Sequence, residues 1–538
     1  MPQPWVPSGM DNRGPAPNRP APNPMTGSSL WLDRAPIETD NELGLNYDDI
    51  VVGAGLTGMT TALLLARAGR KVAVLEAREI GAVTTGNTTG KLSLLQGTKL
   101  STMLSRQSKR VVSAYVEANR EGQAWLLRFC ADHGVPVQVR KAVTYAADAG
   151  PGLRAARREH AAAESLGLPV RWQEHLGVPF PNHGGTVLVD QAQFNSMDVL
   201  DALTGQLREH GGQVFGSRRV VKVSRTGPPT ATLDDGTLVH ARTVVLATGT
   251  PVLDRGLYFA KVEPSRSYAL AFEHTDPPQL MMLGAGSPSR SVRDAPARGT
   301  TTDRLLLVGG EGHTVGRTRS ELARVQSLRE WTLQYFPGAV ETHAWSAQDY
   351  SSHDGVPFVG ALPRGGGHIF VATGFDKWGM SNGVAAALDL TGQILGDPPS
   401  WAKPLHRRLT RPRAAVQLIK INAEVGLSMT LGLAASELHT GPSSAPAEGQ
   451  GQVGREGLLP VGRATVDAET CAVVALCTHL GGALKWNDFA KSWDCPLHGS
   501  RFSPAGEVLE GPATRNLRGA APSSGPESPG HERSTKST

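Results

Sequence analysis

The chain has 538 residues but only four cysteines, 5 % aromatic residues and 19 % charged residues. So few cysteines do not form the framework of a disulfide-rich protein, and the isolated Cys130 and Cys471 are expected to be buried thiols in a helix and a strand. The formal charge of +5 is small, and no run of five basic residues occurs, so no nucleic-acid partner is indicated. The hydrophobic content of 39 % is typical of a globular protein, and the length exceeds one ordinary core.

Apolar runs long enough to cross a bilayer are also missing. The longest weakly polar stretch, residues 425–435, is too short, and no secretory or twin-arginine signal opens the chain. We therefore expect no integral membrane segment and a cytoplasmic protein. The first 29 residues, rich in Pro, and residues 519–538, rich in Ser, Pro and Gly, are predicted to be disordered because they cannot bury enough apolar surface.

Two of the cysteines belong to a pattern near the C-terminus. Cys477 and His479 are followed, after fifteen residues, by Cys495 and His498. Two thiolates and two imidazoles can hold a Rieske two-iron, two-sulfur cluster, with the cysteines on one iron and the histidines on the other. A structural zinc ion is the alternative, but zinc fingers normally pair Cys with Cys and His with His. The cluster is the favoured interpretation.

The surrounding segment, residues 436–517, resembles Rieske domains through the stretches CTHLGG, SWDCPLHGSRF and GEVLEGPA. Gly482 and Leu497 stand where Rieske proteins of cytochrome complexes carry two further cysteines, so the resemblance implies that no disulfide joins the two loops. That suits a reducing compartment. Ser500 keeps a hydroxyl that bonds cluster sulfur in the family, whereas Phe502 replaces a frequent Tyr, which predicts a reduction potential below the respiratory type.

A dinucleotide site is predicted near the other end. A buried strand over residues 47–52 runs into the G-x-G-x-x-G turn of Gly53, Gly55 and Gly58, and a helix over 57–68 follows. Such glycines let the backbone approach a pyrophosphate at the positive end of the helix. Glu76 ends the next strand about twenty residues on, where an acidic side chain bonds a ribose hydroxyl.

Residues 30–399 as a whole resemble the amino-acid-oxidase and glycine-oxidase-like FAD-dependent oxidoreductases, on the segments 88–91, 219–221, 243–249, 354–360 and 372–380. The resemblance implies FAD as the dinucleotide. Since Asn87 occupies the early loop and no Cys lies between Cys130 and Cys471, we expect non-covalent FAD. The predicted FAD-binding residues are Gly53, Gly55, Thr57, Gly58, Glu76, Ala77, Thr88, Thr89, Lys91, Val220, Ala247, Thr248, Gly249, Asp354, Gly374, Lys377, Gly379 and Met380.

The predicted fold is an α/β FAD-binding domain, Rossmann-like and of the glutathione-reductase type, with an inserted α+β substrate domain, followed by a small all-β Rieske domain. The expected divisions are a disordered extension (1–29), the FAD-dependent oxidoreductase domain (30–413), a connecting helix (414–439), a linker (440–452), the Rieske domain (453–518, or from about 436) and a disordered tail (519–538). The Gly, Ser and Pro content of the linker suggests a tethered cluster rather than a fused one.

The two cofactors together predict an enzyme that oxidises a C–N bond of an amine or amino acid and passes electrons singly from flavin to cluster. Electron entry through the cluster, as in a reductase or a monooxygenase-type partner, and a non-enzymatic redox sensor are the alternatives; an external electron acceptor or donor is a possible partner. A nicotinamide site over residues 305–316 is a weaker alternative. Candidate catalytic residues at the substrate wall are Arg266, Trp345, Gln348, Tyr350, Lys377 and Trp378, with Tyr268 beside them. Each has a structural alternative, such as core packing for the tryptophans or an ion pair for Arg266.

Overall fold

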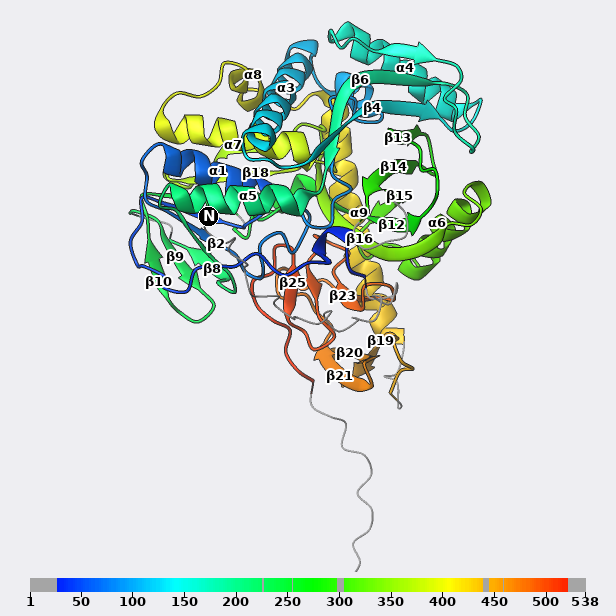
Figure 1. Ribbon diagram of the computed structural model, residues 1–538. Helices are drawn as coiled ribbons and strands as arrows, with labels where there is room; N and C mark the ends of the chain where they lie inside the picture. The colour runs from blue at the N-terminus through cyan, green and yellow to red at the C-terminus, as the bar shows by residue number, and fades with distance from the viewer. Residues whose placement is uncertain are drawn as a thin grey trace, which may run out of the picture.

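The computed structural model describes residues 27–224, 227–253, 255–297, 304–438, 445–457 and 459–520, without the side chains of 430–438. Figure 1 shows a large domain, up to residue 438, above a small C-terminal domain. Most of the predicted disordered ends (1–26 and 521–538) and residues 440–444 of the predicted linker lie outside the described residues.

A six-stranded sheet forms one half of the large domain, in the order β17-β18-β11-β1-β2-β7. Its strands are parallel except for β17, and buried on both faces, as in doubly wound folds. Helices cover one face and a three-stranded sheet, β10-β9-β8, covers the other (Figure 1). The bounds are β1 Asp49–Val52, α1 Leu56–Arg67, β2 Val72–Leu75, α3 Lys109–Asp132, α5 Ser196–Glu209, β7 Gln213–Phe215, β8 Val220–Val223, β9 Thr230–Leu233, β10 Leu238–His240, β11 Thr243–Leu246, β17 Phe358–Ala361, β18 Ile369–Thr373, α7 Gly379–Leu395 and α8 Ala402–His406.

A larger mixed sheet forms the other half, in the order β16-β12-β15-β14-β13-β4-β6-β3, with β5 paired to β6. Helices α4 and α6 pack against this sheet, and helix α2 packs against α4. The bounds are β3 Lys91–Leu92, α2 Lys99–Arg106, β4 Val137–Ala146, α4 Pro151–Ser165, β5 Arg171–Gln173, β6 Gly185–Phe194, η3 Tyr258–Ala260, β12 Val262–Glu273, β13 Leu280–Ala285, β14 Arg290–Pro296, β15 Arg304–Thr314, α6 Glu321–Tyr335 and β16 Val340–Ser352; a short helix, η2 Leu30–Leu32, opens the described chain.

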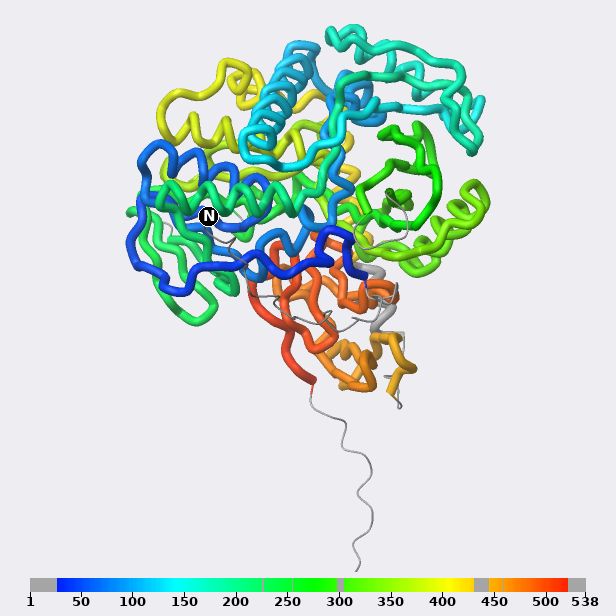
Figure 2. Tube along the Cα trace, viewed as in Figure 1, coloured from blue at the N-terminus to red at the C-terminus, as the bar shows by residue number. Residues whose placement is uncertain are grey.

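The small domain consists of two antiparallel sheets, β19-β20-β21 and β22-β23-β24-β25. The long helix α9 (Pro412–Leu438) runs down the large domain toward it, and Figure 2 shows the C-terminal trace lying directly against the large domain. The bounds are β19 Gly451–Glu456, β20 Leu459–Val466, β21 Glu469–Val474, β22 Lys485–Asn487, β23 Ser492–Asp494, β24 Arg501–Phe502 and β25 Val508–Glu510. The domain has its own core around Trp493, Phe502 and Leu484.

Several side chains fix the two domains together, so the expectation of a merely tethered cluster is wrong. Asp488 of the small domain accepts from the backbone N–H groups of Glu321 and Leu322 at 2.9 Å each and from the Ser320 hydroxyl at 2.6 Å. It therefore caps the N-terminus of α6 in the large domain, where the helix dipole favours a carboxylate. Arg317 donates to the Pro496 carbonyl at 3.1 Å on the same side.

Two further expectations are corrected. The weaker nicotinamide alternative required a strand over residues 305–309 that ends in a glycine turn over 310–316, but β15 continues through these glycines to Thr314 within the large sheet. Cys130 is a buried thiol in α3, as expected, whereas Cys471 in β21 is only half-buried. Within the described residues, no helix combines the length and apolar character that crossing a membrane requires.

Candidate functional site

The glycine turn after β1 is built for close backbone approach. Gly53 has a φ of +105°, and a Cβ there would lie 2.7 Å from the Ala247 carbonyl oxygen. A Cβ on Gly58 would lie 1.9 Å from the Gly53 carbonyl oxygen, so α1 can pack on the turn only with glycine at this position. At the end of β2, the Glu76 carboxylate accepts from the backbone N–H of Ala54 at 2.8 Å and of Arg78 at 3.0 Å. Burial raises the pKa of Glu76, although both bonds oppose this.

An elongated cavity extends from this turn and unites most of the predicted FAD-binding residues. Those that line it are Gly53, Gly55, Thr57, Glu76, Ala77, Thr88, Val220, Ala247, Thr248, Gly249, Lys377, Gly379 and Met380. The glycine turn, the Glu76 carboxylate at the end of β2 and the N-terminus of α7 at Gly379 fit an FAD molecule bound along it. None of the described residues that line this cavity is Cys or His, the usual points of covalent flavin attachment.

Five predicted FAD-binding residues lie outside this lining. Gly58 packs inside the turn. Thr89 and Lys91 line the neighbouring cavity instead. Asp354 bonds Arg408 and Gln107 away from the cavity, which makes its predicted contact with flavin wrong. Gly374 packs against Ser352, where its positive φ turns the chain after β18.

The neighbouring cavity has a volume of about 670 Å³, within the range of small-molecule sites. It shares Thr84, Thr88, Asp349 and Lys377 with the first cavity, so the two meet at these residues. Of the candidate catalytic residues, Trp345, Lys377 and Trp378 line it, together with Tyr268. Residues that the sequence did not single out here include Lys99, Arg106, Glu311, Arg324, Asp349 and Asp376.

The junction of the cavities holds a strained pair of residues. Asp376 and Lys377 have φ values of +51° and +68°, in the left-handed region that non-glycine residues rarely adopt. They are held by Lys99, whose ammonium lies 2.9 Å from the Asp376 carboxylate, and by Asp349, which accepts from the Lys377 N–H at 2.5 Å. Burial raises the pKa of Asp349 to about 6, so this carboxyl changes charge near neutral pH.

Lys91 is a half-buried lysine in the same cavity. Its ammonium donates to the hydroxyls of Ser291 at 2.5 Å and Thr89 at 3.3 Å, and no carboxylate among the described residues pairs with it. Burial, reinforced by the nearby Arg293 guanidinium, lowers the pKa of Lys91 to about 7. A carboxylate on a bound ligand is the complement that this lysine lacks.

The four predicted cluster ligands come together in two facing loops of the small domain. The His479 and His498 rings lie with centroids 5.2 Å apart, and the two thiols share a hydrogen bond that lowers the pKa of Cys477 to about 6. Backbone N–H groups of the same loops donate to both sulfurs. Among the described residues, no three His, Cys, Asp or Glu side chains are grouped so that they could hold one metal ion.

The loops also show the positions at which this sequence differs from the Rieske proteins of cytochrome complexes. Gly482 and Leu497 touch each other where the second pair of cysteines would stand, and all four cysteines are free. The Ser500 hydroxyl bonds the Cys477 sulfur and also accepts from the Ala513 N–H at 3.1 Å. On the outer side, Phe259 of the large domain meets both histidine rings edge-on, with centroids 5.7 and 5.0 Å away.

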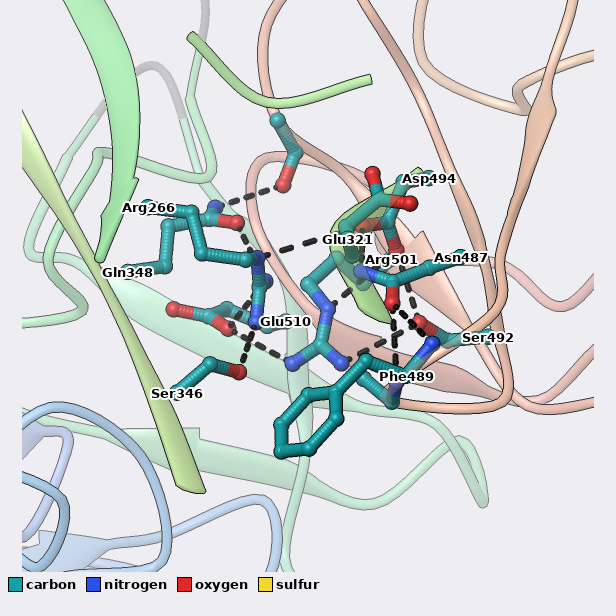
Figure 3. A network of polar contacts seen from close by, with 12 residues as sticks. Arg266, Glu321, Ser346, Gln348, Asn487, Phe489, Ser492, Asp494, Arg501 and Glu510 are labelled. Atoms are coloured by element: carbon teal, nitrogen blue, oxygen red, sulfur yellow. Dashed lines mark hydrogen bonds and ion pairs between the residues drawn. The ribbon is translucent and has the colours of Figure 1, made fainter. Parts of the chain in front are cut away.

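Arg266, Gln348 and Tyr350 do not line the substrate cavity, so their predicted place in its wall is wrong. β12 and β16 turn their odd-numbered residues, such as Ser265, Ala347 and Asp349, to the cavity. Arg266, Ser346 and Gln348 alternate with them and face the small domain, whereas Tyr268, which follows a β-bulge, lines the cavity as well. Figure 3 shows Arg266, Ser346 and Gln348 meeting Asp494, Arg501 and Glu510 there.

The small domain also supplies one wall of the dinucleotide cavity, which sequence reasoning missed. Leu509, Glu510, Gly511, Ala513 and Thr514 line it together with the glycine turn. Arg219 of the large domain donates to the Val508 carbonyl at 2.9 Å and holds β25 against the opening. No local pattern could have revealed this, because the two walls lie more than four hundred positions apart in the chain.

Comparisons with known proteins agree with this geometry. Residues 48–393 match the model of the family described as FAD dependent oxidoreductase, and residues 447–521 match the Rieske [2Fe-2S] domain. The Rieske 2Fe-2S iron-sulfur protein YhfW of Bacillus subtilis (strain 168) is 28 % identical over 484 residues, which cover 88 % of this chain and 92 % of that protein. A cytochrome b6-f complex iron-sulfur subunit of Nostoc sp. is 48 % identical over 42 residues, 8 % of this chain and 24 % of that subunit.

Solved structures share the fold of the large domain. Glycine oxidase from Geobacillus kaustophilus aligns with a TM-score of 0.56 at 19 % identity, over 66 % of this chain and 96 % of its own. L-amino acid deaminase from Proteus vulgaris aligns with a TM-score of 0.55 at 14 % identity, over 69 % and 99 %. At these identities the likeness shows the fold alone. The predicted fold class and both predicted cofactors, FAD and a [2Fe-2S] cluster, are confirmed by the family matches.

Proposed function

Because the chain belongs to the FAD-dependent oxidoreductase family and carries a C-terminal Rieske [2Fe-2S] domain, we propose that it oxidises a C–N bond of an amine or amino acid and delivers the electrons to its own cluster. Oxidation of a CH–NH group to an imine releases two electrons and two protons. FAD held by the glycine turn at Gly53 and by the N-terminus of α7 at Gly379 would supply a two-electron acceptor that can release electrons singly. A Rieske centre holds one electron, so an external one-electron acceptor has to empty it between the two transfers.

The shared wall is the observation that carries this proposal. The cavity that fits FAD is closed by residues of the Rieske domain, Leu509 to Thr514, so the two cofactor sites are neighbours in one body. A redox sensor that signals by releasing its domain is less well supported, since Asp488, Arg317 and Phe259 hold the domain in place.

The substrate class follows from the second cavity and from the named structural relatives. Glycine oxidase, L-proline dehydrogenase and L-amino acid deaminase share this fold. Here Lys91 would bind the carboxylate of such a substrate, while Trp345 and Trp378 enclose its apolar part. Asp349, with a pKa of about 6, stands at the junction and would accept the proton that the amine loses.

Anaerobic mixing with a panel of amino acids and secondary amines tests this function. We expect one class of compound to bleach the flavin absorbance first and the cluster absorbance second. If no compound of the panel reduces the flavin, the proposed substrate class is wrong. If dithionite-reduced cluster is instead oxidised by substrate through the flavin, the direction of electron flow is the reverse.

The mode of FAD attachment has its own test. Since neither Cys nor His lines the described cavity wall, we propose that FAD is held non-covalently. Precipitation of the protein with acid should release all yellow colour into the supernatant. Colour that stays with the precipitated polypeptide would contradict this.

A further inference from the structure

Gln348 lies between the flavin cavity and the cluster loop. It is 2 % exposed and sits on the even-numbered side of β16, toward the Rieske domain. Its side-chain amide donates to the Gly499 carbonyl oxygen at 2.7 Å, and Gly499 stands between the ligand His498 and Ser500. Among the described side chains of the FAD-dependent domain, Gln348 and Arg317 are those that bond the backbone of the loop 495–500.

The orientation of this amide is determined by its other partners. Arg266 donates to Gln348 Oε1 at 2.8 Å, and a guanidinium can only donate. The Nε2 group therefore points the other way and donates both to Gly499 and to the Tyr350 hydroxyl at 3.0 Å. Arg266 is itself fixed by the Ser346 hydroxyl at 2.8 Å and by Asp494 and Glu510, both at 3.9 Å.

Tyr350 completes a continuous path. Its ring packs against Gly249, 3.8 Å from the position of a Cβ there, and Gly249 lines the cavity that fits FAD. On the other side, Gly499 has a φ of +76° and comes so near that a Cβ would lie 2.8 Å from Gln348 Nε2. Gly249, Tyr350, Gln348 and Gly499 thus form an unbroken chain of contacts from cavity wall to ligand loop.

We propose that Gln348 is a positioning residue that bridges the two cofactor sites: its amide fixes the ligand loop 495–500 against the flavin cavity and so sets the rate of electron transfer between them. The inference rests on the proposed function for the direction of the electrons, but the bridge itself is a property of this chain's own residues. It leaves substrate binding untouched, because Gln348 does not line the substrate cavity.

Two variants of the holoenzyme test the bridge. Gln348→Met keeps the length of the side chain but removes the amide. Gln348→Glu keeps an acceptor for Arg266 but has no N–H for Gly499. Gln393→Met is the control, since Gln393 of α7 bonds Asp389 and lies outside the domain contact. Amide hydrogen exchange of the peptide that spans residues 495–500 is measured first, without turnover.

Both Gln348 variants should exchange faster in this peptide than wild type and the control. Illumination with EDTA under anaerobic conditions then reduces the flavin without any substrate, and the cluster signal in electron paramagnetic resonance reports the arrival of electrons. We expect about tenfold slower arrival in both variants, because the ligand loop is no longer held in one position against the flavin cavity. Wild-type exchange and a wild-type rate in Gln348→Glu would overturn the bridge and leave the proposed function standing. If the cluster of the wild-type protein stays oxidised while its flavin is reduced, the proposed electron route from flavin to cluster is wrong. The proposed role of Gln348 in that route is then wrong as well.

Discussion

The two faces of the β12–β16 strand pair do different work. The odd-numbered face, with Ala347 and Asp349, lines a cavity for a small molecule, whereas the even-numbered face, with Arg266 and Gln348, holds a second domain. Neighbouring positions on one strand therefore have separate roles, one in lining the cavity and the other in the contact between the domains. The cavity lining includes the strained pair Asp376 and Lys377 and also Lys91, which has no carboxylate partner among the described residues, whereas Arg266 and Arg501 of the domain contact lie within 3.9 Å of Asp494 and Glu510. Binding a ligand requires unsatisfied groups, and permanent docking requires satisfied ones.

Gly499→Val, which disturbs the contact between the two domains, is expected to have the largest effect. A Cβ there would meet Pro264 at 2.6 Å, and the left-handed φ adds strain, so we expect about 3 kcal/mol of lost stability and weaker FAD binding. FAD affinity is measured by fluorescence of released flavin, and iron content shows whether the cluster is retained. Gly481→Val is the matched control, because Gly481 has a φ of +73° but no atom within 4 Å of its Cβ position. Equal losses in both variants would mean that strain, not docking, is responsible.

Arg266→Met should remove the hydrogen bonds and ion pairs at the centre of the even-numbered face. Glu510 and Asp494 would keep Arg501 as their cationic partner, and Gln348 would lose the donor that orients it, at a cost of about 3 kcal/mol in the free energy of unfolding. Denaturant unfolding measures this. The control is Arg329→Met on the same half of the protein, which breaks the more exposed pair with Glu341 and should cost less than about 1 kcal/mol. A smaller effect for Arg266 than for Arg329 would contradict the assignment.

Lys91→Met tests the cavity that the odd-numbered face lines together with β3. The lowered pKa of about 7 means that Lys91 is charged below pH 7 and neutral above it, so acetate should bind more weakly as the pH rises from 6 to 8. In the variant the affinity should fall about tenfold at pH 6 and lose this pH dependence. Perturbation of the flavin spectrum by acetate measures binding, and acetamide serves as the uncharged control. Unchanged pH dependence in the variant would assign the effect to another group, with Asp349 as the first alternative.

The smallest effect is expected from Tyr350→Phe. It removes one of the two acceptors of the Gln348 amide but leaves the ring against Gly249 and the bond to Gly499, at a cost of about 1 kcal/mol. Unfolding experiments and hydrogen exchange of residues 495–500 both test this. Exchange as fast as in Gln348→Met would show that the tyrosine hydroxyl, not the glutamine, fixes the loop.

The sequence indicated those parts of the site that depend on local spacing. The turn at Gly53, Gly55 and Gly58 and the ligand loops at Cys477 and Cys495 each lie within one short segment, so their geometry follows from the residues themselves. The fold class and the two cofactors followed from these segments and the family resemblance.

The parts that could not be predicted depend on long-range packing. Arg266, Gln348 and Tyr350 lie in β12 and β16, which border the second cavity, but on the opposite face from the residues that line it, because successive side chains of a strand point to opposite sides. Nothing in a single sequence marks which side faces the ligand. The Rieske wall at Leu509 to Thr514 was missed for the same reason, since it joins segments from opposite ends of the chain.

That wall has a consequence for how the protein matures. The last strand of the described chain, β25, borders the compartment that β1 opens, so the nucleotide site is complete only once the small domain has folded against the large one. We therefore expect that cells starved of iron accumulate a form short of both prosthetic groups, because a misfolded C-terminus leaves the nucleotide without a lid.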